Sequence, residues 1–327
     1  MSADNDLHNT QAGGDVHSAH PDVMRVAACL KAAGLKPPAQ TDVGSVRDYL
    51  ERVSLFVAAT SEPLTCELLV DFPVSGRFVP CKLYWPDSLD PAGLLFYCHG
   101  GGFRHGSLAG WDAPLRQLVR SSGVAVLSIE YALAPEYPFP TAFEEVLSIA
   151  QQVIEAQAIA GRTVSQFALG GDSAGANLAL GVALSLRDQG VALRQLLLFY
   201  GVYSTDTSAP SWRRFGGFGG YGLSADSMRM YWHSYLSRGE SDWRVQPLHA
   251  ELQGLPRTRL VVGELDPLVD ENTQLQRKLE AAGVDSSLVV LPGIIHGVLR
   301  FSELAGVVRE IIEKEGAILS AALSQDI

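Results

Sequence analysis

Short apolar runs alternate with segments of helical periodicity along most of this chain, beginning near residue 65. Runs of this length, bounded by Gly, Pro or polar residues, predict β-strands that are buried in a sheet. The predicted strands are CELLVDFP (66–73), RFVPCKLYWP (77–86), GLLFYCH (93–99), VAVLSIEY (124–131), FALG (167–170), QLLLFYG (195–201), TRLVVGE (258–264) and SSLVVLP (286–292).

Helical patterns separate most of the later strands. They cover about ten residues between 99 and 124, then residues 174–188, residues 270–282 and a final amphipathic stretch. Strands that alternate with helices predict a mostly parallel sheet whose two faces are both covered. The predicted fold class is therefore α/β.

Two regions interrupt this alternation. Residues 21–34 and 43–59 predict two helices ahead of the first strand. Residues 203–251 are rich in aromatic residues and glycine, and they predict one helix near their middle but no strand. We interpret residues 61–327 as an α/β domain, with the helices of 21–60 and the insertion at 203–251 forming a helical cap over one edge of its sheet.

The N-terminus and the composition restrict the class of protein. Residues 1–20 are polar and aperiodic, which predicts a disordered tail and no secretory signal. Of the 327 residues, 47% are hydrophobic, and no apolar run is long enough to span a bilayer. The formal net charge of −11, without a basic block, disfavours nucleic acid and anionic membranes as partners. We expect a cytoplasmic protein that binds a small neutral molecule, and the sequence leaves homo-oligomerisation open.

Cysteines and histidines give no sign of a metal or redox site. The four cysteines lack CxxC spacing and are predicted to be free, buried thiols: Cys29, Cys66, Cys81 and Cys98. Three histidines of the predicted tail are interpreted as solvated side chains rather than metal ligands: His8, His17 and His20. No metal or organic cofactor is expected.

The stretch GDSAG places a serine between small residues where a predicted strand gives way to a predicted helix. Gly171, Ser173 and Gly175 match GxSxG, which is typical of a nucleophile elbow. In such a turn the serine hydroxyl projects above the sheet, and the backbone N–H of Ala174 at the helix start faces developing negative charge. The alternative is a Gly-rich turn in which the serine only caps the helix.

Three consecutive glycines follow the predicted strand at 93–99. Gly100, Gly101 and Gly102 lack side chains, so the backbone can approach a ligand and present bare N–H groups. Fixed N–H donors are what an oxyanion hole requires. A merely flexible loop would also be rich in glycine, but the two motifs together favour acyl-transfer chemistry.

An acyl-transfer serine needs a base and a group that orients the base. In this fold class the acid and then the histidine follow the serine along the chain. Asp266 and His296 fit this order, because each follows a predicted strand. Glu264 and Asp270 are alternatives to Asp266. His233 and His249 fit poorly as the base because they lie within the insertion.

The motifs HGGGF, YALAPEYPFPTA, GDSAG, DPLVDE and HGV, in this order, resemble the hormone-sensitive lipase family of α/β hydrolases. The resemblance runs from about residue 65 to the C-terminus and is strongest to the bacterial acetyl esterase group. It implies an α/β-hydrolase fold and a serine carboxylesterase that hydrolyses short-chain, acetyl-like esters through an acyl-enzyme, without a cofactor. The implied site residues are Ser173 as nucleophile, His296 as base, Asp266 as orienting acid, and the N–H groups of Gly101, Gly102 and Ala174 as oxyanion hole.

One departure from the family pattern, one competing motif and one alternative function remain. Ala132 stands where the family's YRLAPE motif usually carries Arg, which puts any structural ion pair from that position in doubt. The stretch GFGGYG, residues 217–222, satisfies GxGxxG, but no predicted strand precedes it, which disfavours a nucleotide site. The alternative function is a non-catalytic ligand-binding protein on the same fold.

Overall fold

A computed structural model describes residues 18–38, 42–88, 91–217, 220–236 and 242–324. Its centre is an eight-stranded sheet with the strand order β1-β2-β4-β3-β7-β8-β9-β10. The strands are β1 (Cys66–Val74), β2 (Arg77–Trp85), β3 (Leu94–Cys98), β4 (Ala125–Ile129), β7 (Phe167–Asp172), β8 (Gln195–Phe199), β9 (Arg257–Leu265) and β10 (Ser286–Ile295).

The sheet is parallel from β4 to β10, and only the pairings β1–β2 and β2–β4 are antiparallel. Every residue of β3, β4, β7 and β8 is buried. Strands that are covered on both faces carry continuous apolar runs, which is why these segments could be recognised. The predicted α/β class with a mostly parallel sheet is confirmed.

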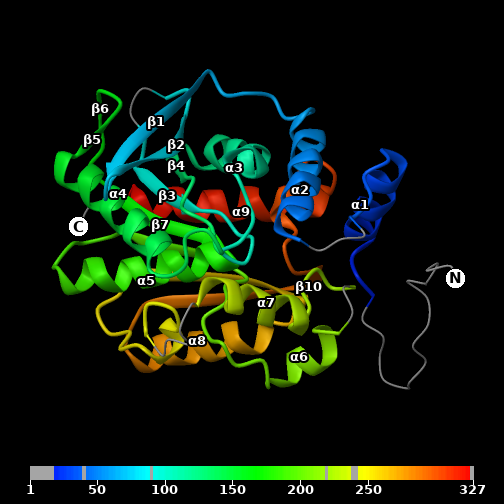
Figure 1. The fold of residues 1–327 in the computed structure, drawn as a ribbon. Coiled ribbons are helices and arrows are strands. Elements are labelled where there is room, and N and C mark those ends of the chain that lie inside the picture. Colours follow the sequence, from blue (N-terminus) through cyan, green and yellow to red (C-terminus); the bar gives the residue numbers. More distant parts are fainter. Residues whose placement is uncertain (1–17, 39–41, 89–90, 218–219, 237–241, 325–327) are drawn as a thin grey trace, which may run out of the picture.

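Helices cover both faces of the sheet (Figure 1). Helices α3 (Leu108–Ser122) and α9 (Gly306–Leu323) share one buried cluster with alternate residues of β3, Leu95 and Tyr97. The other alternate residues of β3 belong to the opposite cluster, together with apolar residues of α4 (Thr141–Ala156), α5 (Ala174–Asp188) and α8 (Val269–Ala281). This division follows from the two-residue period of a strand, which sends successive side chains to opposite faces.

The helix α4 was not predicted from the sequence. Its buried residues recur at helical spacing: Ala142, Phe143, Glu145, Val146, Ile149, Ala150 and Val153. A short hairpin of β5 (Ala158–Ile159) and β6 (Arg162–Thr163) follows it. The predicted alternation of strands and helices therefore holds also between β4 and β7.

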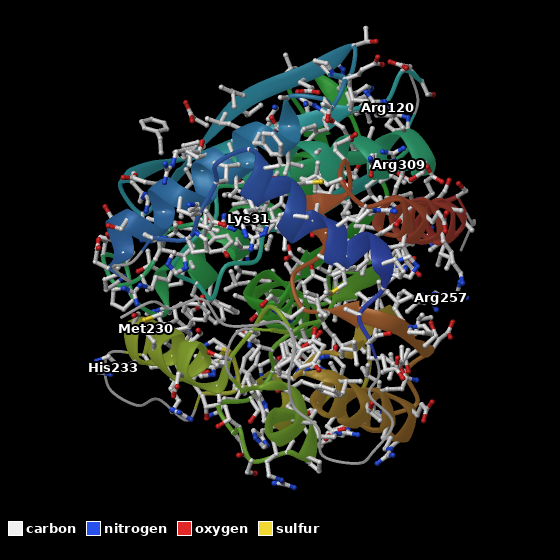
Figure 2. The ribbon with its side chains drawn as sticks, turned by 90° about the vertical axis from the view of Figure 1, so that its right-hand side faces the viewer. Lys31, Arg120, Met230, His233, Arg257 and Arg309 are labelled. Carbon is white, nitrogen blue, oxygen red and sulfur yellow. The ribbon has the colours of Figure 1, made fainter. Side chains whose placement is uncertain are left out.

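The two regions that interrupt the alternation form helices. The N-terminal pair is α1 (Pro21–Ala32) and α2 (Val43–Ala58), and both contribute to the cluster of α3 and α9. The insertion contains α6 (Pro210–Phe215), α7 (Ala225–Tyr235) and the short helix η1 (Pro247–His249). Its buried aromatic residues Tyr203, Trp212, Trp232 and Tyr235 join the opposite cluster. Figure 2 views the molecule from the side of α1, and α1 crosses in front of the sheet edge.

The start of α1 is tied to the end of β10. His20 caps the helix, since its Nδ1 accepts a hydrogen bond from Asp22 N at 3.2 Å. The backbone N–H of His20 donates to Gly293 O at 2.8 Å. Residues 1–17 of the predicted tail, with His8 and His17, lie outside the described residues.

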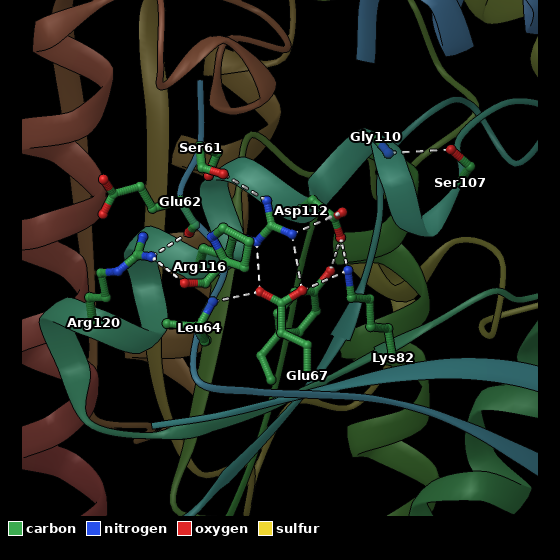
Figure 3. Close-up of polar contacts among 12 residues, drawn as sticks. Ser61, Glu62, Leu64, Glu67, Lys82, Ser107, Gly110, Asp112, Arg116 and Arg120 are labelled. Carbon is green, nitrogen blue, oxygen red and sulfur yellow. Dashed lines mark hydrogen bonds and ion pairs between the residues drawn. The ribbon is translucent and has the colours of Figure 1, made fainter. Parts of the chain in front are cut away.

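An ionic cluster joins α3 to the antiparallel end of the sheet (Figure 3). The guanidinium of Arg116 donates to both carboxylate oxygens of Glu67 on β1, at 2.7 and 3.0 Å. Lys82 on β2 lies 2.9 Å from Glu67 and 2.7 Å from Asp112 of α3. Paired, largely buried charges of this kind fix the orientation of a helix on a strand pair.

All four cysteines are free, as expected, but they are not all buried. Cys81 and Cys98 lie inside the sheet, whereas Cys66 is half-buried and Cys29 is exposed. The prediction of a buried thiol was wrong for Cys29, because this residue faces outward from α1, whose buried side consists of Val23, Val26 and Leu30. None of the described helices combines the length and the apolarity needed to cross a membrane.

Candidate active site

Ser173 occupies the turn between β7 and α5. Its backbone has φ 53° and ψ −117°, a conformation that is strained for a residue with a side chain. A Cβ atom on Gly171 would lie 2.4 Å from Cys98 O, and one on Gly175 only 1.9 Å from the same atom. Only glycine fits at both positions, so the GxSxG spacing has a direct steric cause.

The side chains of three loops converge at the carboxyl ends of parallel strands. Ser173 Oγ lies 3.0 Å from Nε2 of His296, which directly follows β10. Nδ1 of His296 lies 2.8 Å from Oδ2 of Asp266, which directly follows β9. Asp266 is fully buried and His296 is 8% exposed. The chain thus brings together a hydroxyl, an imidazole and a carboxylate in a linear series.

The other candidate acids lie elsewhere. Glu264 accepts a hydrogen bond from Gly293 N at 3.0 Å, and Asp270 accepts one from Ser211 N at 2.8 Å. The remaining oxygen of Asp266 accepts from Leu268 N at 2.8 Å, which holds the carboxylate in place. Two histidines of the insertion, His233 and His249, are exposed on the surface.

The glycine loop passes beside Ser173 in a conformation that side chains would disrupt. Gly101 has φ 127°, and a Cβ there would lie 2.1 Å from the carbonyl oxygen of His105. Gly102 has φ 61°, and a Cβ there would lie 2.3 Å from the ring of Tyr231. Among the described residues, the N–H groups of Gly101 and Gly102 have no backbone acceptor. They are available to a ligand, as is the N–H of Ala174, the first residue of α5.

Asp172, which precedes the serine, was not singled out from the sequence. It is buried, and its carboxylate accepts from Gly100 N at 2.8 Å and from Tyr97 OH at 3.0 Å. Burial raises the pKa of Asp172 to about 6, although both hydrogen bonds act in the opposite direction. The position of an aspartate inside GDSAG, one residue before the serine, was the signal available.

Tyr200 extends the contacts of Asp172 to the histidine loop. Its hydroxyl lies 3.3 Å from Asp172 Oδ2, and it accepts a hydrogen bond from Leu299 N, also at 3.3 Å. The ring of Tyr200 meets that of His296 edge to face, with 4.9 Å between centroids. Asp172 and Tyr200 thus connect the glycine loop to the loop that carries the imidazole.

A cavity of about 280 Å³ opens above Ser173 and His296. Segments on both sides of the sheet line it. The N-terminal region contributes Pro37, Pro38, Val46, Tyr49 and Leu50, and the insertion contributes Gly222, Leu223, Met228 and Tyr231. The stretch GFGGYG follows helix α6 instead of a strand, so its part in the site is to line this cavity through Gly222.

The ion pair that the absence of an arginine at position 132 put in doubt is formed by a residue of β2. The backbone N–H of Ala132 donates to Glu145 Oε2 at 2.7 Å, and Glu145 is buried. Arg77 of β2 lies 3.0 Å from Glu145 Oε1. Arg77 therefore supplies the positive partner of this carboxylate, although no arginine stands at position 132.

Comparison with known proteins assigns the family. A profile described as the α/β hydrolase fold matches residues 95–300, more than half of the chain. The chain belongs to the α/β hydrolase family. The resemblance to the hormone-sensitive lipase group of α/β hydrolases is thereby confirmed.

Individual α/β hydrolases match over nearly the whole chain. An acetyl esterase of Salmonella choleraesuis is 31% identical over 299 residues, which cover 89% of this chain and 91% of that protein. The structure of an esterase from Pyrobaculum calidifontis is similar with a TM-score of 0.86 at 29% identity, covering 94% of this chain and 100% of the other. EstE1, a thermostable carboxylesterase from a metagenomic library, has a TM-score of 0.83 at 32% identity, covering 87% and 99%.

Proposed function

We propose that this α/β hydrolase is a serine carboxylesterase that cleaves short acyl esters through an acyl-enzyme. The observation that carries the proposal is the series Ser173, His296, Asp266, joined at 3.0 and 2.8 Å beside a row of glycine N–H groups. A serine is a weak nucleophile unless a base removes its proton, and this arrangement provides the base and the group that orients it. The similarity to proteins named acetyl esterase and carboxylesterase supports the same chemistry.

The proposed reaction has two halves. Ser173 Oγ attacks the ester carbonyl while its proton passes to Nε2 of His296, and the tetrahedral intermediate expels the alcohol, which takes that proton. Water then attacks the acyl-enzyme, gives its proton to His296, and releases the carboxylic acid as the proton returns to Ser173. Asp266 holds the imidazole in the tautomer whose Nε2 can accept a proton, and stabilises the cation that forms.

The negative charge on the carbonyl oxygen needs donors that are already in place. We assign this role to the N–H groups of Gly101, Gly102 and Ala174. Donors that do not reorganise during the reaction stabilise the intermediate by a factor of about a hundred or more each. The tight turns of the glycine loop and the helix start at Ala174 hold these groups in fixed positions.

The size and the walls of the cavity support the proposed preference for short acyl groups. A volume of about 280 Å³ is small for an organic ligand site. We propose that residues 21–60 and the insertion at 203–251 act as a cap on the catalytic domain, because both regions supply residues that line the cavity above Ser173. A cap of this kind limits the length of the substrate and excludes water.

The test compares Ser173→Ala with Ser208→Ala, an exposed serine outside the cavity. We expect Ser173→Ala to lose p-nitrophenyl acetate hydrolysis by several orders of magnitude, and Ser208→Ala to keep it. An organophosphate should label the wild-type protein with one equivalent at Ser173. If the wild-type protein takes no label and turns over no ester, the alternative of a non-catalytic ligand-binding protein is correct.

A cytoplasmic location and the state of assembly stay predictions. Cell fractionation tests the first, and light scattering of the purified protein tests the second. The proposed chemistry depends on neither, since all the residues assigned to it come from one chain.

A further inference from the structure

Arg300 lies four residues beyond His296, within the short helix η2 (Leu299–Phe301). It lines the cavity that contains Ser173 and His296. It also lines two adjoining cavities, one of about 280 Å³ beneath α1 and one of about 340 Å³ between α2 and the glycine loop. Arg300 thus lines three adjoining cavities, one of which also contains Ser173 and His296.

No carboxylate in the part of the chain that the structure describes forms an ion pair with Arg300. The guanidinium carbon of Arg300 lies 5.2 Å from the centroid of the Phe301 ring. Several other arginines form ion pairs, as Arg116 does with Glu67 and Arg259 with Glu315. A half-buried guanidinium that stacks on a ring keeps its N–H edge free, and this edge matches the two oxygens of a carboxylate.

Three of the four acidic residues that line these cavities accept hydrogen bonds within the protein. In the cavity of Ser173, Asp172 is buried and accepts hydrogen bonds from Gly100 N and Tyr97 OH. In the cavity between α2 and the glycine loop, Glu51 accepts from Ser107 and Glu130 accepts from the N–H of Leu108. Asp48 also lines that second cavity, but not the one that holds Ser173.

His105 provides an independent sign of a ligand at this place. It lines the cavity of Ser173 and the one beside it, is 2% exposed, and its Nε2 has no hydrogen-bond partner among the described residues. Burial lowers the pKa of His105 to about 4, and the charges of Arg104, Arg47 and Arg300 add to this effect. The ring is therefore neutral near pH 7, and its unpartnered Nε2 leaves a hydrogen bond for a ligand to make.

We propose that Arg300 binds a carboxylate on the substrate, so that the preferred ester carries a negative charge in addition to its scissile bond. This inference depends on the proposed esterase function and specifies its substrate class. It also departs from the expectation of a neutral ligand, which came from the net charge of −11. The net charge describes the whole surface, whereas Arg300 adds a positive charge at the cavity itself.

The experiment compares charged and neutral esters that are otherwise alike. One pair is 4-acetoxybenzoate and its methyl ester, which places the charge in the alcohol half. The other pair is mono-4-nitrophenyl succinate and its methyl ester, which places the charge in the acyl half. The readout is the ratio of kcat/KM for the anionic ester to kcat/KM for the neutral one. The variants are Arg300→Gln, Arg300→Lys and, as a matched control, Arg309→Gln, whose side chain is on the outer surface (Figure 2).

We expect Arg300→Gln to lower this ratio about tenfold or more in at least one pair, the scale of a lost charge-assisted hydrogen bond. Arg300→Lys should retain part of the ratio, and Arg309→Gln should leave it as in the wild type. If Arg300→Gln changes the ratio in neither pair, the inference is wrong although the esterase function stands. If Ser173→Ala hydrolyses these esters as the wild type does, it is the proposed function that fails.

A measurement on the wild-type protein covers the case in which the Arg300 variants do not fold. Benzoate and benzamide have the same shape but differ in charge, and both can compete with a neutral ester. We expect benzoate to inhibit at least about tenfold more strongly at low salt, with the difference shrinking as salt screens the charge. Equal inhibition by the two compounds would overturn the inference.

Discussion

The backbone N–H of Gly100 donates to Oδ1 of Asp172 at 2.8 Å, and this hydrogen bond joins the glycine loop to the last residue of β7, directly before Ser173. The proposed nucleophile and two of the proposed oxyanion donors, Gly101 and Gly102, come from segments that are far apart in the chain. Asp172 fixes the distance between them. It is a positioning residue, because its own oxygens face Gly100, Tyr97 and Tyr200.

Replacing Asp172 should reduce activity through this geometry. We expect Asp172→Ala to lower kcat/KM for p-nitrophenyl acetate about a hundredfold, since displacing a donor by about 1 Å has an effect of that size. The fall should appear mainly in kcat. Organophosphate labelling of Ser173 should also slow, because it passes through a similar oxyanion. A variant with wild-type kcat would show that the glycine loop holds its position without Asp172.

The raised pKa of Asp172 also predicts how stability changes with pH. A carboxyl group whose pKa is about 6 in the folded protein and 3.8 when unfolded favours folding below pH 3.8. That contribution is lost as the pH rises through 6. We therefore expect the stability of Asp172→Asn, relative to the wild type, to increase between pH 4 and 7 by up to about 3 kcal/mol. Urea unfolding at several pH values measures this, and a difference independent of pH would contradict it.

The two glycines of the loop should respond differently to substitution. In Gly101→Ala the new methyl group would meet the backbone of His105, whereas in Gly102→Ala it would meet the side chain of Tyr231. We expect each variant to lose activity about a hundredfold or more. Adding Tyr231→Ala should restore part of the activity of Gly102→Ala but none of Gly101→Ala. Equal behaviour of the two double variants would refute this steric account.

Asp266 and Asp270 lie four positions apart, and only the first reaches the imidazole. We expect Asp266→Asn to lower kcat by about 10³ to 10⁴, because an amide stabilises the wrong tautomer of His296. Asp270→Asn is the matched control, since its side chain bonds to Ser211 N and can still accept that hydrogen bond. A similar loss of kcat in both variants would indicate that the substitutions act by disturbing the start of α8, and not through the contact between Asp266 and His296.

The ionic cluster at α3 should make the fold sensitive to acid. Burial disfavours the charge of Glu67, but Arg116, the N–H of Leu64 and Lys82 outweigh it and lower its pKa to about 2. The stabilisation is thus complete above pH 4.5 and is lost as the pH falls towards 2. We expect Glu67→Gln to lower the free energy of unfolding by about 2–3 kcal/mol at pH 7. The variant should also lose less of that free energy than the wild type does as the pH falls from 4.5 towards 2.

The control for this prediction is Glu62→Gln, an exposed glutamate that lies close to Glu67 in the sequence. Its effect should stay within about 0.5 kcal/mol at all pH values. Chemical unfolding followed by tryptophan fluorescence gives both values. If Glu67→Gln is as stable as the wild type at pH 7, the cluster does not stabilise α3.

The sequence was sufficient for most of the secondary structure. The helix predicted at 174–188 has those bounds in the structure, and α1 and α2 differ from prediction by one or two residues at their ends. Helix α4 was not predicted, although its buried apolar residues have helical spacing.

The sequence by itself determined the strands, the tight turn at Ser173 and the order of the serine, acid and histidine, because apolar periodicity and steric limits on a turn are local properties. The tertiary structure alone decided which carboxylate faces His296, which residue pairs with Glu145, and that Asp172 supports the glycine loop. It also left Arg300 without a carboxylate partner in the described chain. Such contacts depend on where distant segments meet in the fold. The local sequence pattern of a strand or helix does not specify which distant residue its side chains will contact.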